Sequence, residues 1–252
     1  MAGSDAGVGG IYNHINLNLY NYGNNNPIRY IDPDGLSPSD MEAACMAKDV
    51  YDYSDGKDLR APLPGGWERE DLKPLPKGGA IGIYSRVVDD KKEYTLANKG
   101  TDSPSGWGEN FSQPFGNSED MWASINFAKD FVGKNLDADI TFTGHSKGGA
   151  EAAANAVATN KNAVVFNPAT VFLNSYGLSA ENYKGSMNAY IVQGEILNKI
   201  FGIISRPIDK LTVLPPPMLS TMLHVSGYTV AASVNSHSMG SVLKGMTRRG
   251  IE

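Results

Sequence analysis

The sequence predicts an α/β fold, a mostly parallel sheet flanked by helices and preceded by a short β-hairpin. Strand-like apolar segments alternate with helix-like segments through most of the chain, a pattern typical of parallel sheets. One of these strands runs into a helix through a Gly-x-Ser-x-Gly element at residues 144–148. The length of 252 residues, 41% of them hydrophobic and 19% charged, is ample for a buried core.

The predicted hairpin lies at residues 11–31. Apolar residues alternate there with asparagine, which predicts strands, and the Gly/Asn/Pro cluster at 23–27 predicts the turn between them. Because an isolated hairpin is marginally stable at best, we interpret this segment as the remnant of a larger β structure. We therefore divide the chain into a β-remnant over residues 1–36 and a second domain over residues 37–252.

A helix opens the second domain. Ser37 or Ser39 followed by Asp40-Met41-Glu42 is typical of a helix start, and the helix is expected to continue to about Tyr53. Residues 61–79 are rich in proline and glycine and predict a loop. The spacing of apolar residues then predicts strands at 80–88, 93–98, 138–143, 162–166 and 187–193, helices at 119–135 and 147–160, and an amphipathic stretch at 239–246.

Composition excludes several classes of protein. The net charge of −5, from 22 basic and 27 acidic residues, disfavours a nucleic-acid binder, which usually carries a basic excess. The single cysteine, Cys45, excludes an internal disulfide and a zinc or iron–sulfur centre built from several cysteines. No apolar run approaches the roughly 18 residues of a membrane span. The first residues have neither the basic nor the apolar region of a signal peptide, so none is expected.

The Gly144-His145-Ser146-Lys147-Gly148 element predicts a nucleophile. An apolar strand precedes it and an alanine-rich helix follows, and in this context the serine sits on a tight, strained turn that exposes its hydroxyl. The two glycines let the strand and the helix approach closely. The start of the helix presents backbone N–H groups to developing negative charge. We expect Lys147 to be a surface residue that contributes its backbone N–H.

A second oxyanion donor is expected in the loop after an earlier strand. Gly100 allows the backbone to turn there, and Thr101 can offer both an N–H and a hydroxyl. The loop that follows, at 105–115, carries Trp107 and two phenylalanines. These aromatic side chains are expected either to contact acyl chains or a bilayer surface, or to anchor the core.

An attacking serine needs a base, usually a histidine, and the chain has four. His14 lies in the β-remnant, and His145 adjoins Ser146 on the turn, so it is expected to point away from the serine. Two candidates remain, His224 and His237, of which His237 lies in a polar loop before the C-terminal amphipathic stretch.

The acid that orients the histidine is expected at the end of a strand. Glu195 follows the apolar strand at 187–193, and polar groups at such strand ends form the sites of open α/β sheets. This choice also keeps the order serine, acid, histidine that is typical of this kind of elbow. Asp209 is the rival carboxylate, and of the two we favour Glu195.

These motifs together resemble the class 3 (fungal-type) lipase superfamily of α/β-hydrolases, over about residues 80–245. Lys99-Gly100-Thr101-Asp102 resembles the family's Arg-Gly-Ser/Thr oxyanion element, with Lys99 in place of arginine. The resemblance implies a lid at 105–115 and a base just before the final helix, which selects His237. It implies a triad of Ser146, His237 and Glu195, with the backbone N–H groups of Thr101 and Lys147 as the oxyanion hole. No cofactor or metal is expected.

The prefix carries a second resemblance. The run from Asn25 to Leu36, Asn-Asn-Pro-Ile-Arg-Tyr-Ile-Asp-Pro-Asp-Gly-Leu, resembles the end of the core of Rhs-repeat (YD-repeat) proteins. These proteins enclose a C-terminal toxin and cut themselves after this motif, here between Leu36 and Ser37. The resemblance implies an antibacterial effector that is exported by a type VI secretion apparatus, acts on the phospholipids of a target membrane and is blocked by an immunity protein.

Three other functions fit parts of this pattern. A small-substrate esterase or thioesterase would use the same triad without a lid. A non-catalytic binding module could retain the elbow. A nuclease toxin is another cargo of such cores, but the acidic balance and the lack of a metal-ligand cluster argue against it.

Overall fold

The structure is a computed structural model that describes residues 38–52, 62–100, 118–193, 209–216 and 238–251. All of them belong to one of the two units into which the chain divides, Leu36–Glu252. The predicted hairpin at 11–31 and the predicted boundary after residue 36 lie outside the described residues.

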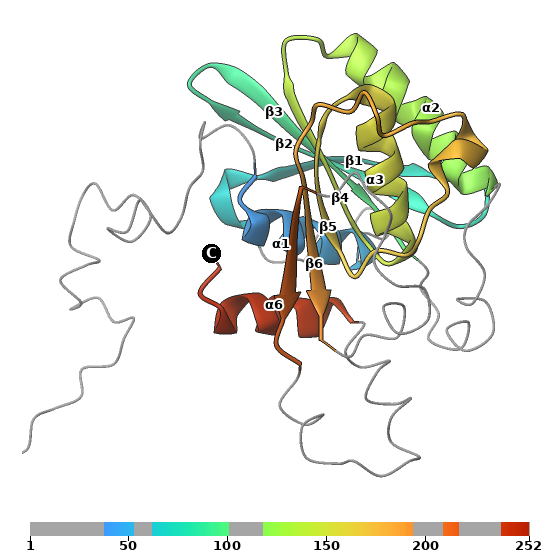
Figure 1. Cartoon of the computed structure of the whole chain (residues 1–252). Helices are drawn as coiled ribbons and strands as arrows, with labels where there is room; N and C mark the ends of the chain where they lie inside the picture. Colours follow the sequence, from blue (N-terminus) through green and yellow to red (C-terminus); the bar gives the residue numbers. More distant parts are fainter. Residues whose placement is uncertain (1–37, 53–61, 101–117, 194–208, 217–237, 252) are drawn as a thin grey trace, which may run out of the picture. The chain divides into compact units, whose positions relative to one another are not determined.

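A seven-stranded sheet forms the centre of this unit, with its strands in the order in which they occur along the chain (Figure 1). The first three strands pair antiparallel and the last five, counted from β3, pair parallel. This confirms the predicted α/β fold with a mostly parallel sheet. The strands are β1 (Glu68–Pro74), β2 (Ala80–Val88), β3 (Lys91–Asn98), β4 (Asp139–His145), β5 (Asn162–Phe166), β6 (Met187–Val192) and β7 (Lys210–Leu214).

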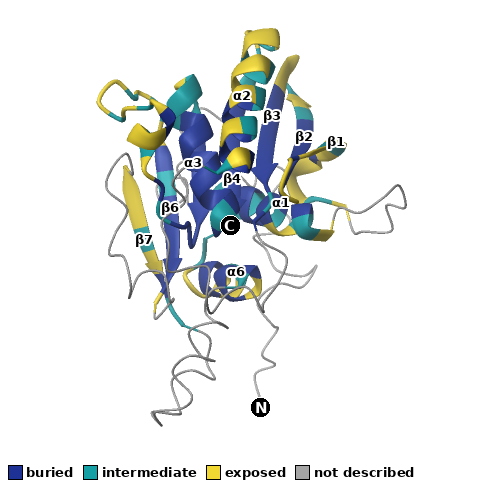
Figure 2. Cartoon of the chain, turned by 90° about the vertical axis from the view of Figure 1, so that its right-hand side faces the viewer, coloured by how far each residue is buried: buried dark blue, intermediate teal, exposed yellow. Residues whose placement is uncertain are grey.

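Helices cover both faces of the sheet. Successive side chains of β5 point to opposite faces of the sheet. On one face, Ala163 and Val165 pack in one core cluster with residues of α2 (Glu119–Lys134) and α3 (Lys147–Thr159). Val164 and Phe166 pack in another core cluster, with residues of α1 (Asp40–Asp52) and α6 (Met239–Arg248). Two layers of helices therefore enclose the central strands, which are dark blue in Figure 2, while the edge strands β1 and β7 are largely exposed.

Helix α1 begins at Asp40, within the segment where the sequence predicts a helix start. Ser39 precedes the helix, and its hydroxyl accepts a hydrogen bond from the Glu42 backbone N–H at 3.2 Å. The Glu42 carboxylate accepts one in return from the Ser39 backbone N–H at 2.9 Å. This reciprocal capping box satisfies two backbone donors that a helix N-terminus otherwise leaves without intrahelical partners.

Neither edge strand, β1 or β7, was predicted from the sequence. The predicted loop at 61–79 is wrong in its middle, because β1 lies within it, and β7 lies in a segment for which no strand was expected. The sequence of β1, Glu-Arg-Glu-Asp-Leu-Lys-Pro, has little strand propensity and no alternation, and a bulge interrupts its pairing with β2 between Arg69 and Asp71. Charged residues and bulges are typical of edge strands, where they oppose pairing with another chain.

The parallel strands end at one edge of the sheet, which positions the site. His145 is the last residue of β4 and pairs with Phe166, the last residue of β5, and Val192 likewise pairs with Leu214. The carboxyl edge of an open α/β sheet is where ligands bind. The residue that follows His145 at this edge is Ser146.

Candidate active site

Ser146 occupies a strained turn between β4 and α3. Its backbone has φ 59° and ψ −125°, a conformation that is costly for any residue with a side chain. Three backbone hydrogen bonds hold it there: the Ser146 N–H donates to Phe166 O at 3.1 Å, and the Ser146 carbonyl accepts from the N–H groups of Ala150 and Ala169 at 3.1 and 3.0 Å. The strained turn that the sequence predicts between a strand and a helix is therefore present at Ser146.

The two glycines of the motif are required by packing. A Cβ on Gly144 would lie 2.3 Å from the carbonyl oxygen of Gly148. A Cβ on Gly148 would lie 2.1 Å from the carbonyl oxygen of Asn98, at the end of β3. Both distances are shorter than any tolerated contact, and both obstacles are backbone atoms. The motif thus brings β3, β4 and α3 together at one point.

The Ser146 hydroxyl is buried, with 3% of the residue exposed, and its Oγ has no hydrogen-bond partner among the described residues. Buried polar atoms without a partner are rare, and they occur at catalytic positions. The arrangement leaves this oxygen available to a base from another segment.

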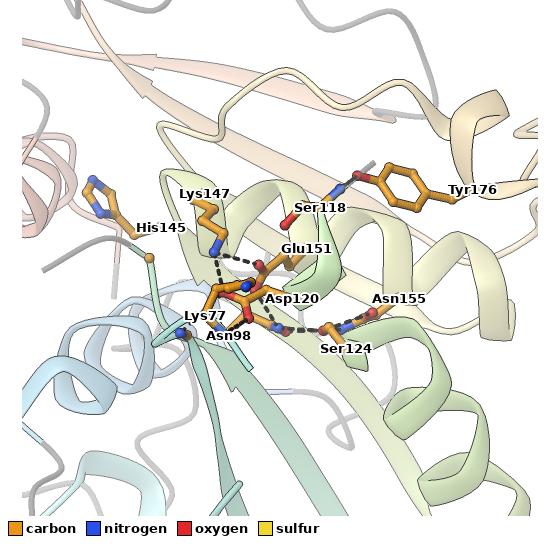
Figure 3. A network of polar contacts seen from close by, with 12 residues as sticks. Lys77, Asn98, Ser118, Asp120, Ser124, His145, Lys147, Glu151, Asn155 and Tyr176 are labelled. Atoms are coloured by element: carbon orange, nitrogen blue, oxygen red, sulfur yellow. Dashed lines mark hydrogen bonds and ion pairs between the residues drawn. The ribbon is translucent and has the colours of Figure 1, made fainter. Parts of the chain in front are cut away.

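A buried polar cluster lies directly behind the elbow, made of residues from β3, α2 and α3 (Figure 3). The Lys147 ammonium pairs with Asp120 at 2.5 Å and lies 3.6 Å from the Glu151 carboxylate. The predicted surface position of the Lys147 side chain is therefore wrong: 14% of it is exposed, and both carboxylates are fully buried. The side chain runs inward because α2 places Asp120 beside the start of α3. The cluster, which we call the Lys147 cluster, consists of Asn98, Asp120, Ser124, Lys147, Glu151 and Asn155.

The two carboxyl groups of the Lys147 cluster have opposite pKa shifts. Burial raises the pKa of Glu151 to about 7, because the charge of Lys147 and a hydrogen bond from Asn98 offset only part of the desolvation. Burial also acts to raise the pKa of Asp120, but hydrogen bonds from the Lys147 ammonium and the Lys77 backbone N–H outweigh it, so the Asp120 pKa lies below its usual range. At neutral pH Asp120 is therefore the anion that neutralises Lys147.

Tyr51, near the end of α1, connects the elbow to the predicted oxyanion loop. Its hydroxyl accepts a hydrogen bond from the Gly100 backbone N–H at 3.1 Å and lies 3.2 Å from Nδ1 of His145. A Cβ on Gly100 would lie 2.3 Å from that hydroxyl and 2.7 Å from the His145 carbonyl oxygen. The residue before Thr101 is thus packed against the elbow.

The match to known families agrees with this geometry. The family model for the Tle-like phospholipase domain matches residues 42–211, about two thirds of the chain. The chain belongs to the Tle-like phospholipase domain family. It is therefore a lipase-like ester hydrolase. Among curated protein sequences, none matches the chain significantly.

The fold of this Tle-like domain is similar to that of solved lipases. A deletion mutant of the Rhizomucor miehei lipase propeptide complex shares 13% identity, with a TM-score of 0.50, over 84% of this chain and 78% of that chain. A triacylglycerol lipase from Penicillium expansum shares 14% identity with a TM-score of 0.44, over 69% of this chain and 77% of its own. The likeness to the Rhizomucor miehei protein concerns the fold.

The described part of the Tle-like domain contains only some of the predicted site residues. Ser146 and Lys147 are described and adjacent. Thr101 and Glu195 lie outside the described residues, as do both candidate bases, His224 and His237.

The rival acid, Asp209, lies at the wrong edge of the sheet. Its carboxylate accepts a hydrogen bond from the Met187 backbone N–H at 2.8 Å, at the first residue of β6. Ser146 follows the opposite, carboxyl edge, about 16 Å away along a strand of this length. Asp209 therefore ties β7 to β6 and is too far from Ser146 to form a catalytic triad with it.

Three residues of the site were not predicted from the sequence. Asp120 and Tyr51 reach the elbow from helices distant in the chain, and no local pattern marks them. Glu151 had a weak signal, because it lies four residues after Lys147 in an otherwise alanine-rich helix, the spacing of a helical ion pair.

The described residues hold neither a candidate metal site nor a helix that could span a membrane. They contain no group of three histidine, cysteine or acidic side chains that could hold a metal ion. Within the same residues, no helix has the length and apolar character needed to cross a membrane.

Proposed function

We propose that the domain hydrolyses ester bonds of membrane phospholipids with Ser146 as nucleophile, His237 as general base and Glu195 as the acid that orients it. The observation that carries this proposal is the strained, glycine-flanked Ser146, whose buried Oγ has no hydrogen-bond partner among the described residues. The family match over residues 42–211 supports the phospholipid as substrate.

The proposed reaction proceeds through an acyl-enzyme that forms on Ser146. His237 takes the Ser146 hydroxyl proton as Oγ attacks the ester carbonyl carbon, and the backbone N–H groups of Thr101 and Lys147 stabilise the resulting oxyanion. The C–O bond of the ester then breaks, and His237 returns the proton to the departing alcohol, a lysophospholipid. Water activated by His237 next attacks the acyl-enzyme, which releases the fatty acid and restores the Ser146 hydroxyl.

The neighbouring elements support the choice of the acid and the base. β6 ends at Val192, three residues before Glu195, at the same edge of the sheet as Ser146. α6 begins at Met239, two residues after His237, and it packs in one core cluster with the last residues of β5, β6 and β7. Both segments therefore leave the described structure near the carboxyl edge.

The biological role that we propose is that of an antibacterial effector. The Rhs-like run that ends at Leu36 supports export through a type VI secretion apparatus and release of residues 37–252 in a target cell. A producing cell then needs an immunity protein that blocks the site. Targeting the chain to the bacterial periplasm is expected to stop growth, and Ser146→Ala is expected to abolish this effect.

Fatty-acid release from vesicles of phosphatidylethanolamine and phosphatidylglycerol tests the proposed activity. Ser146→Ala is expected to lower the rate by at least about a thousandfold, because the nucleophile is lost. Ser186→Ala is the matched control, since Ser186 is exposed at the amino edge of β6. Full activity of Ser146→Ala would exclude the proposed mechanism. Hydrolysis of a soluble short-chain ester without release from vesicles would exclude the phospholipid and favour a small-substrate esterase.

A further inference from the structure

The side chain of Lys147 has an unexpected position for a residue beside a nucleophile. Lys147 is the first residue of α3, where a cation is unfavourable because the helix dipole places positive charge at that end. Its ammonium nevertheless turns inward, 2.5 Å from Asp120 and 3.6 Å from Glu151 (Figure 3). Burying an ion pair gains little net stability over apolar packing, so stability alone does not account for the arrangement.

Asp120 is a rigid anchor for that ammonium. Its two oxygens accept hydrogen bonds from the backbone N–H groups of Lys77 and Gly79, in the turn between β1 and β2, at 2.7 and 3.3 Å. It also lies in the first turn of α2, where a carboxylate is favoured by the helix dipole. Two elements therefore fix the point to which Lys147 is tethered.

The same cluster extends to the end of β3, which leads into the predicted oxyanion loop. The Asn98 amide donates hydrogen bonds to Glu151 at 3.2 Å and to Ser124 at 2.8 Å. The Asn98 carbonyl oxygen lies against Gly148, where a Cβ would approach it to 2.1 Å. The two segments that carry the proposed oxyanion donors are thus joined through one buried polar cluster.

We propose that Lys147 is a positioning residue: the tether of its ammonium to Asp120 holds its own backbone N–H in the orientation that stabilises the oxyanion. The inference rests on the proposed function, which assigns Ser146 as nucleophile and this N–H as a donor. The buried carboxylates set the position of the side chain, and the side chain sets the position of the first peptide of α3. Such rigidity matters because a donor contributes fully only when it is preorganised toward the developing charge.

Steady-state kinetics of Lys147→Met on dibutyrylphosphatidylcholine, a short-chain monomeric phospholipid, test this role. We expect kcat to fall about 10- to 100-fold with KM within about twofold, since the donor is misplaced but not removed. Phenylboronic acid, which forms a tetrahedral adduct with a serine, is expected to show a Ki raised by a similar factor. If Lys147→Met only lowered the fraction of folded enzyme, kcat would fall and the Ki would not change, and the proposal would be wrong.

Two further variants complete the test. Lys134→Met is the matched control, because Lys134 forms an exposed ion pair with Asp130 on α2, and it is expected to leave kcat and Ki unchanged. In Asp120→Asn/Lys147→Met both buried charges are removed, so stability is expected to recover while kcat remains low. Recovery of kcat together with stability would overturn the positioning role.

The outcome for Ser146→Ala separates this proposal from the proposed function. An active Ser146→Ala variant would refute the mechanism itself. An inactive Ser146→Ala variant, together with wild-type kcat and Ki for Lys147→Met, would refute only the role of Lys147.

Discussion

Among single residues, Glu151 is the clearest example of a side chain whose surroundings change its chemistry. It lies in an alanine-rich helix, yet its carboxyl group is fully buried beside Lys147 from its own helix, Asp120 from α2 and Asn98 from β3. Because Asp120 already neutralises Lys147, a second negative charge in this cluster has no counterion of its own. Burial consequently raises the pKa of Glu151 to about 7.

This raised pKa predicts a pH-dependent stability. The folded state holds the Glu151 proton up to about pH 7, whereas the unfolded chain releases it near pH 4.5, so the contribution of Glu151 is complete below pH 4.5 and is lost as the pH rises through about 7. Glu151→Gln removes this loss. The free energy of unfolding of Glu151→Gln minus that of wild type is therefore expected to be about 3 kcal/mol larger at pH 8 than at pH 4.5.

Urea unfolding of both proteins at several pH values measures that difference, in which the titration of all other groups cancels to first order. A difference that does not change with pH would contradict the prediction.

At the scale of elements, the junction of β4 and α3 depends on close backbone contact with β3. Gly148 lies where β3 ends, so any Cβ there would meet the Asn98 carbonyl oxygen at 2.1 Å. Gly133, in α2, has open space around its Cα and lies in a helix, where alanine is preferred. Gly148 and Gly133 therefore provide a test and a control for the same glycine-to-alanine substitution.

We expect Gly148→Ala to lower the free energy of unfolding by about 3 kcal/mol or more, because backbone atoms must move to admit the Cβ. Gly133→Ala is expected to raise it by up to about 1 kcal/mol. Thermal and urea unfolding measure both changes. A Gly148→Ala variant as stable as wild type would show that the contact between β3 and α3 is loose enough to admit a Cβ.

At the scale of the whole molecule, the parallel sheet places Ser146 and Asp209 at opposite edges. Ser146 follows the carboxyl edge, and the segment that carries Glu195 leaves β6 at the same edge. Asp209 lies at the amino edge, where it binds the first residue of β6.

This separation predicts different outcomes for the two acids. If Glu195 is the acid of the proposed triad, Glu195→Gln is expected to lower kcat by about three to four orders of magnitude, because His237 loses its orienting charge. Asp209→Asn is expected to leave kcat within about twofold, since asparagine still offers an oxygen to the Met187 N–H. Kinetics on vesicles of phosphatidylethanolamine and phosphatidylglycerol measure both. A large loss of kcat in Asp209→Asn would contradict the assignment of the edges.

The sequence by itself determined the features that depend on local pattern. The alternation of strands and helices predicted the fold class, and the helix at 147–160 and the strand at 162–166 match α3 and β5 closely. The Gly-x-Ser-x-Gly element predicted the elbow, because its glycines and its position between a strand and a helix are both visible in the chain. A serine followed by acidic residues at 40 and 42 predicted the start of α1 in the same way.

Only the tertiary structure decided which charged and polar groups meet. β1 forms because β2 offers it a ladder of hydrogen bonds, although its own sequence has little strand propensity. The Lys147 ammonium turns inward because α2 places Asp120 beside it, and Asp209 lies far from Ser146 because β6 and β7 run parallel. The burial of a charge depends on what packs against it from elsewhere in the chain, and no local pattern records that neighbour.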